Sequence, residues 1–374
     1  MEMTKSQEMF FELLQIALGN RECLSRDLSA DEWEQIYNLS KEQIVFGVML
    51  KGIQHLPQGQ WPPKFLLLQW VGETNIIQQQ NEEMDKAVVE LCQSMEDEDI
   101  RIFIFKGQSV GTLYNDPSLR QSGDIDFYCH NEDWVKAIQY FKKKKGLQLN
   151  NLHSQKDVSF TLNDIIYEMH NQITVFSYPI HSRYWKRIVM PEIIAHPYSV
   201  KVGGMDVPTL APTYNALFIF IHIFQHLIAD GIALRQFCDW AWVLSTQHDE
   251  IDVDVLRRHL RKLGLLKAYS GLGAVLTEML GIAPELFPFE ISDKDRERLP
   301  ALWQNMLEHG NFGKKLAYKT KNMYAHGLEH LWRMGKQARE FYHYAPAEAW
   351  WHIPHMFSWW PIKFGIILKK TRNV

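Results

Sequence analysis

Two aspartates stand two residues apart in a short apolar run, Asp124-Ile-Asp-Phe-Tyr-Cys129. In a β-strand, side chains two residues apart point to the same face, so Asp124 and Asp126 project together with Cα atoms about 7 Å apart. Two carboxylates this close repel one another unless a cation lies between them. The expected cation is Mg²⁺, or Mn²⁺ in its place, bound through carboxylates and substrate phosphates. The alternative is a solvated strand end without a metal.

Residues upstream of the aspartates have the chemistry to bind phosphate. The run Arg101–Phe105 has β propensity and ends at Lys106-Gly107, after which one or two helical turns are expected. Free N–H groups at a helix start attract anions, and glycine lets a triphosphate approach closely. Lys106 adds an ammonium, Ser109 a hydroxyl and Arg120 a forked guanidinium that can clamp a phosphate. Metal on one side and donors on the other suit in-line displacement at phosphorus.

Two further pairs are spaced four residues apart on expected helices. His222 and His226 have the spacing of a two-histidine metal face, but no glutamate stands between them to complete a zinc-protease signature. We expect them to line the cleft near the strand carboxylates, with no tightly bound transition metal. Arg235 and Asp239 are expected to form an ion pair on the helix surface.

The first hundred residues are expected to be helical. Ser29-Ala-Asp-Glu32 is a capping box that opens one helix, and Pro62-Pro63 starts a long helix that reaches about Glu96. The polar run 78–83 interrupts the apolar stripe of that helix, which we therefore expect to emerge into solvent there.

Strand patterns dominate the next hundred residues. A helix is expected from about Glu132 to Lys144, and Gly203-Gly204 predicts the turn of a hairpin over 199–207. The other expected strands are 101–105, 124–129, 148–152, 157–162 and 165–173.

From Pro212 onward the pattern is helical again. The expected helices are 214–229, 234–245, 253–263, 269–280, 293–308, 327–343 and 361–370. The chain is therefore expected to have an α+β fold, with a helical region at 1–98, a mixed α/β module at 99–210 and a helical domain at 211–374.

Composition limits the function classes. The net charge of −4, from 40 basic and 44 acidic residues, provides no basic surface for general nucleic-acid binding. No segment reaches the ~18 apolar residues of a transmembrane helix, and the first residues lack the pattern of a signal peptide. Four well-separated cysteines suit a reducing compartment, so we expect a cytoplasmic protein. The aromatic and basic tail 355–370 either packs as a helix, the interpretation we prefer, or contacts a membrane surface.

The run from Lys106-Gly107 through Arg120 to Asp124-Ile-Asp126 resembles the bacterial uncharacterised nucleotidyltransferase family of the DNA polymerase beta-like superfamily. The resemblance extends over about residues 6–345. Its further landmarks are Glu168-Met-His170, Arg183–Arg187, the helical residues His222, His226, Gly231, Arg235 and Asp239, and Gly310–Gly313.

The resemblance implies a nucleotidyltransferase-like fold in which three carboxylates hold two metal ions. Asp124 and Asp126 match the first two carboxylates, and Glu168 is the candidate for the third, on a neighbouring strand. A surface position on an amphipathic strand is the alternative for Glu168. His170 shares its strand face and is expected to be a hydrogen-bonded structural residue. The turn departs from the superfamily pattern, because Gln108 follows Gly107 where serine or glycine is usual.

The implied activity is transfer of a nucleoside monophosphate from a nucleoside triphosphate, ATP among them, to an unidentified hydroxyl-bearing acceptor. That acceptor is a small molecule or a protein, and adenylyltransferases of the aminoglycoside or lincosamide kind are one such case. The alternative is a non-catalytic nucleotide-binding or regulatory protein that retains the fold.

Overall fold

The N-terminal helices form a packed group. The computed structural model describes residues 3–152, 157–229, 231–310, 323–352 and 354. The first helices are α1 (Lys5–Ala17), α2 (Ala30–Glu42) and α3 (Phe46–His55). The predicted capping box is confirmed at α2, where the Glu32 N–H donates to the Ser29 hydroxyl and the Ser29 N–H donates to the Glu32 carboxylate.

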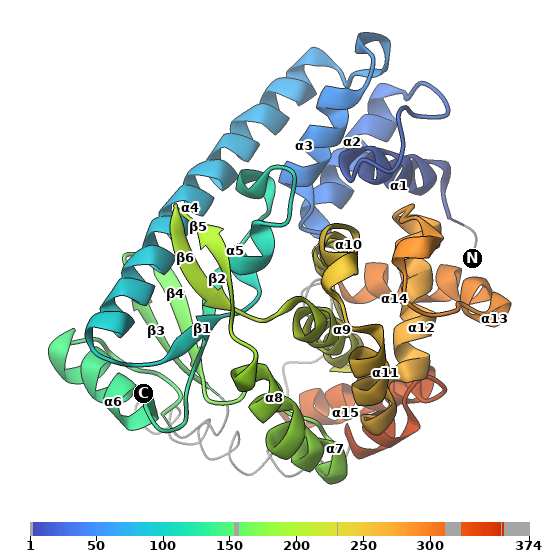
Figure 1. The fold of residues 1–374 in the computed structure, drawn as a ribbon. Helices are drawn as coiled ribbons and strands as arrows, with labels where there is room; N and C mark the ends of the chain where they lie inside the picture. Colours follow the sequence, from blue (N-terminus) through green and yellow to red (C-terminus); the bar gives the residue numbers. More distant parts are fainter. Residues whose placement is uncertain (1–2, 153–156, 230, 311–322, 353, 355–374) are drawn as a thin grey trace.

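Helix α4 (Lys64–Asp97) follows Pro62-Pro63 as predicted and extends from the N-terminal helices to the sheet (Figure 1). Its first half buries Trp70 in the helical core, and its second half packs on the sheet. The expectation that the polar run 78–83 emerges into solvent is wrong at Asn81, which is 3% exposed. The amide of Asn81 is buried because it donates to two carbonyls of the loop before the acidic strand.

A four-stranded mixed sheet has the order β1-β2-β4-β3. Strand β2 runs antiparallel to β1 and parallel to β4, and β3 runs antiparallel to β4. The expected strand at 148–152 is absent, and only Asn150 bridges to Ser159 there. The strands are β1 (Ile102–Ile104), β2 (Asp124–Cys129), β3 (Asp157–Leu162) and β4 (Ile165–His170).

Shorter elements complete this part. Helix α5 (Gly107–Gly111) follows β1, and α6 (Trp134–Gln139) continues as a π-helical turn over Tyr140–Lys144. Strands β5 (Tyr198–Val202) and β6 (Met205–Thr209) form the predicted hairpin, whose two turn residues Gly203 and Gly204 have φ of +55° and +85°. Helices α7 (Pro179–Tyr184) and α8 (Met190–Ala195) precede this hairpin.

The rest of the described chain is helical. The predicted helix 293–308 is divided in two, because Pro300 stands in the first turn of a new helix. The residues of the expected helix 361–370, the aromatic tail and Asn311–Gly313 lie outside the described residues. The helices are α9 (Pro212–Ala229), α10 (Leu234–Gln247), α11 (Val253–Lys262), α12 (Leu266–Ala274), α13 (Asp293–Glu297), α14 (Leu299–His309) and α15 (Met323–Phe341).

Two hydrophobic cores hold these layers together. One core joins the N-terminal helices to the C-terminal helices, and Phe10 of α1 stacks on Trp303 of α14 with ring centroids 6.4 Å apart. The other lies between the sheet and the second half of α4. The fold is therefore α+β, as predicted, and the three-part division of the chain stays a prediction.

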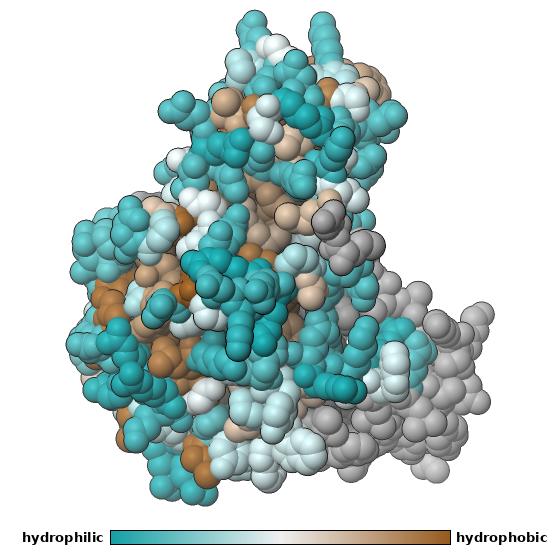
Figure 2. Space-filling view, turned by 90° about the vertical axis from the view of Figure 1, so that its right-hand side faces the viewer, coloured by the Kyte–Doolittle hydropathy of each residue, from teal (hydrophilic) through white to brown (hydrophobic). Residues whose placement is uncertain are grey.

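The surface in Figure 2 is mostly hydrophilic, with apolar side chains in smaller patches. Among the described residues, no helix has both the length and the apolar character needed to cross a membrane.

Candidate functional site

The acidic residues are brought together by strand register. Asp124 and Asp126 lie on β2, two residues apart, and the parallel pairing of β2 with β4 sets Glu168 directly beside Asp126. His170, at the end of β4, lies two residues beyond Glu168 and therefore on the same face. The middle of the sheet thus carries three carboxylates and an imidazole on one face.

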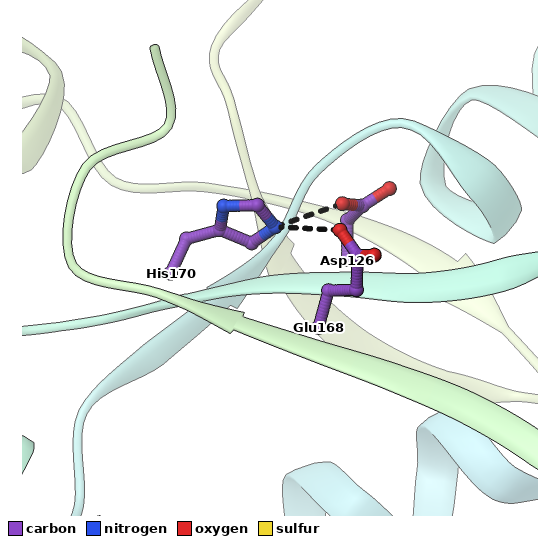
Figure 3. Close-up of side chains that lie close together, drawn as sticks. All are labelled: Asp126, Glu168 and His170. Carbon is purple, nitrogen blue, oxygen red and sulfur yellow. Dashed lines mark hydrogen bonds and ion pairs between the residues drawn. The ribbon is translucent and has the colours of Figure 1, made fainter. Parts of the chain in front are cut away.

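Three of these side chains offer ligand atoms within 4.8 Å of one another: Asp126, Glu168 and His170. His170 Nε2 lies 2.9 Å from Asp126 Oδ1 and 3.5 Å from Glu168 Oε2, and its ring points at both carboxylates (Figure 3). Asp126 and His170 are buried, whereas the Glu168 side chain is 33% exposed. Carboxylate oxygens with an imidazole nitrogen form a donor set that suits a divalent cation. Asp124 stands at the edge of this group.

Lys106 supplies the opposite charge. Its Nζ lies 3.0 Å from Asp126 Oδ2. Burial by itself would raise the pKa of Asp126, but the Lys106 ammonium and the His170 ring outweigh it and hold that pKa well below its usual range. Burial, and then the charge of Asp126, raise the pKa of Asp124. Asp126 is therefore ionised and fits a cation-binding role. A cation placed nearby would favour the ionised form of Asp124.

The predicted phosphate turn has an unusual backbone. Lys106 has φ +60° and ψ −155°, a region that glycine occupies readily and other residues seldom do, and Gly107 follows with φ +48°. Such strain persists only where surrounding contacts hold it, and it is common at functional sites. Ser109 is buried, and its hydroxyl donates to the Lys106 carbonyl at 2.8 Å. In this structure the serine closes the turn.

A pocket of about 80 Å³ opens beside these residues, between the sheet and the C-terminal helices. Lys106, Gly107 and the two aspartates of β2 line one side, and α9 and α10 line the other. The pocket residues from the loop before β2 and from these helices are Arg120, Ser122, Gly123, Ile219, His222, Arg235, Gln236 and Asp239.

Arg120 lines the pocket, but its guanidinium is engaged within the protein. Nε and Nη2 donate to the two carboxylate oxygens of Asp239 at 2.7 and 2.8 Å, and Nη1 donates to Ser122 Oγ at 2.7 Å. The Tyr114 hydroxyl also donates to Asp239. The expected surface pair of Arg235 with Asp239 is wrong, because Asp239 is 5% exposed and its bidentate partner is Arg120.

The two histidines of α9 lie next to each other with ring centroids 4.4 Å apart. His222 lines the pocket that Asp124 and Asp126 share, as expected for a cleft residue. His226 lies one helical turn further along α9 and does not line this pocket. Their lack of a transition metal stays a prediction.

Sequence reasoning missed the residues that hold the loop before β2. Asn81 Nδ2 donates to the carbonyls of Ser118 and Arg120 at 2.7 Å each, and the Phe46 N–H donates to Gln121 Oε1. The only local signal was the polar run in α4, which has the same composition as a solvated helix face.

Comparison with known proteins gives one family and one related structure. A model of the family described as "Uncharacterised nucleotidyltransferase" matches residues 29–281. An antigenic nucleotidyltransferase-like protein from Paracoccidioides brasiliensis is similar in structure, with 13% identity over 54% of this chain and 93% of that one, and a TM-score of 0.34. No curated protein matches.

Proposed function

Because the chain belongs to the uncharacterised nucleotidyltransferase family, we propose that it transfers a nucleoside monophosphate from a nucleoside triphosphate to a hydroxyl-bearing acceptor. The observation that carries the proposal is the register of β2 and β4, which sets Glu168 beside Asp126. Asp126 in turn lines a pocket together with Lys106 and Gly107. The pocket thus combines carboxylates for divalent cations with groups suited to phosphate.

Asp124, Asp126 and Glu168 would hold Mg²⁺ or Mn²⁺, in the two-metal arrangement that this superfamily implies. The bound ions would neutralise charge on the reacting phosphate. His170 orients the Asp126 carboxylate through the 2.9 Å hydrogen bond. Asp126 is ionised, so it can serve as a ligand without first losing a proton.

The chain's own groups cover the remaining steps. Glu168, which is more exposed than Asp126, accepts the proton of the acceptor hydroxyl as the oxygen of that hydroxyl bonds to the α-phosphorus. The bond from that phosphorus to the bridging oxygen breaks, and pyrophosphate leaves. Lys106 and the Gly107 backbone, which line the same pocket as Asp126, would stabilise charge on the leaving phosphates.

One observation favours the alternative, a non-catalytic nucleotide-binding protein. Both oxygens of Asp126 already have protein partners, Lys106 on one and His170 on the other. A site neutralised in this way can bind a nucleotide without binding the metals that transfer requires.

A thermal-shift series tests the proposal. Each of the four common triphosphates at millimolar concentration, with and without Mg²⁺, is added to the full chain. Ligand at 100 times its Kd stabilises the native state by about 2.7 kcal/mol, which gives a measurable rise in Tm. We expect the rise to need Mg²⁺ and to disappear in Asp124→Asn and Asp126→Asn. Asp206→Asn, on the exposed hairpin, is the matched control and should keep the Mg²⁺-dependent rise in Tm.

The reaction product then distinguishes nucleotidyl transfer from non-catalytic nucleotide binding. Label from the α-phosphate that becomes attached to a small-molecule or protein fraction of a cell extract indicates transfer. Stabilisation by Mg²⁺ and nucleotide without any attached label favours the non-catalytic protein. If no triphosphate shifts the Tm, both nucleotide functions are excluded.

A further inference from the structure

Helix α10 contributes three polar residues to the pocket that the strand aspartates line: Arg235, Gln236 and Asp239. The third pocket residue of that helix, Asp239, is engaged with Arg120. Since Arg120 also uses its remaining nitrogen on Ser122, it would have to abandon a buried ion pair in order to bind a phosphate. Lys106 is also paired, with Asp126, so the phosphates need a cation in addition to Lys106.

Arg235 meets that need. Its Nη1 donates to the Gln121 carbonyl at 2.7 Å, and its buried Nε has no hydrogen-bond partner in the segments that the structure describes. Within the described part of the chain, no carboxylate forms an ion pair with it. Burial and the like charge of Arg120 outweigh the opposite charges of Asp239 and Asp124 and lower the pKa of Arg235. A partly buried guanidinium without an ion-pair partner is stabilised when an anion binds to it. The fork of an arginine also matches phosphate oxygens.

Gln236 gives a second, independent indication. Its side chain is 3% exposed, and among the described residues neither amide atom, Nε2 or Oε1, has a hydrogen-bond partner. Buried amides without partners are rare in native proteins. A phosphate oxygen can satisfy Nε2 because it accepts, but Oε1 needs a donor. The complementary ligand must therefore carry an N–H or O–H group as well as phosphate.

We infer that Arg235 binds the phosphate chain of the nucleotide and that Gln236 binds a hydroxyl or amino group on the nucleoside part of the same molecule. The inference rests on the proposed function and assigns substrate binding to α10. Arg120 then serves as a positioning residue that holds α10 against the loop before β2.

Equilibrium binding to the full chain tests both residues, with Mg²⁺ present and ATP and inorganic tripolyphosphate as the probes. We expect Arg235→Met to weaken both probes about 10- to 100-fold, which corresponds to the loss of charge-assisted hydrogen bonds. Arg235→Lys keeps the positive charge and should lose less affinity for both probes than Arg235→Met. Gln236→Met should weaken ATP about 10-fold and leave tripolyphosphate unchanged. Arg261→Met, at an exposed position on α11, is the control and should bind both probes normally.

Analogues identify the group that Gln236 contacts. The wild-type protein should bind one of 2′-deoxy-ATP, 3′-deoxy-ATP or inosine triphosphate about as weakly as Gln236→Met binds ATP. The analogue that is weakened identifies a ribose hydroxyl or the amino group of the base.

The outcomes that contradict the inference differ from those that contradict the proposed function. If the wild type binds ATP and Arg235→Met binds it equally well, the role of Arg235 is wrong while the proposed function stands. If Gln236→Met keeps full affinity for ATP, the role of Gln236 is wrong. If the wild type binds neither probe, both the inference and the proposed function fail. The Tm of each ligand-free variant shows that it is folded, and we expect Arg235→Met to be at least as stable as the wild type.

Discussion

The buried ion pair of Arg120 with Asp239 allows a double-mutant cycle. We expect each single variant to be less stable than the double variant. The variants are Arg120→Met, Asp239→Leu and the two combined. Both side chains are nearly fully buried, and two parallel hydrogen bonds of 2.7 and 2.8 Å join them. Each replacement is an apolar side chain of similar size.

The magnitude follows from what each single variant leaves behind. Removing one partner strands the other as an unpaired buried charge, which costs about 3–5 kcal/mol of unfolding free energy. Asp239→Leu should be the worse of the two, because the Tyr114 hydroxyl also loses its acceptor, at about 1–3 kcal/mol. The double variant buries no charge, so we expect it to be more stable than either single variant, with a coupling energy of about 3 kcal/mol or more.

Urea unfolding followed by tryptophan fluorescence measures these free energies, since the chain has 13 tryptophans. The same cycle on Lys201 and Asp206, an exposed pair on the β5–β6 hairpin with side chains 67% and 64% exposed, is the control. It should give a coupling of about 0–1 kcal/mol. A double variant of Arg120 and Asp239 whose loss equals the sum of the two single losses would refute the reasoning.

Two further predictions concern residues around the site. Asn81→Leu should lower the unfolding free energy by about 2–4 kcal/mol, because the carbonyls of Ser118 and Arg120 lose their buried donor; an unchanged urea midpoint would contradict this. Elemental analysis of protein purified without a histidine tag should find no stoichiometric zinc, because the neighbouring rings of His222 and His226 line or border a cleft. Stoichiometric zinc that is lost in His222→Ala would instead indicate a structural metal site.

Local patterns were sufficient for most of the elements. The capping box at Ser29, the start of α4 after Pro62-Pro63 and the glycine turn of the β5–β6 hairpin are each set by a few adjacent residues. The strand expected at 148–152 failed because pairing of a strand depends on a partner from elsewhere in the chain, and only one bridge forms there.

The arginines illustrate what local spacing cannot decide. On α10, Arg235 and Asp239 are four residues apart, so an ion pair between them was a reasonable expectation. Asp239 faces the interior and pairs with Arg120, from the loop before β2. Which arginine reaches a buried carboxylate depends on how a distant loop packs against the helix. Asn81 holds that loop through hydrogen bonds that no sequence period reveals.

The sequence by itself determined that Asp124 and Asp126 share a strand face, because the two-residue period of a strand is a local property. Tertiary structure decided the remaining members of the site. The register between β2 and β4 set Glu168 and His170 beside Asp126. The packing of α10 against the loop before β2 engaged Arg120 with Asp239 and placed Arg235 and Gln236 in the pocket that the two aspartates line. These contacts join residues far apart in the chain, and they form only when burial of both hydrophobic cores brings the sheet and the helices together.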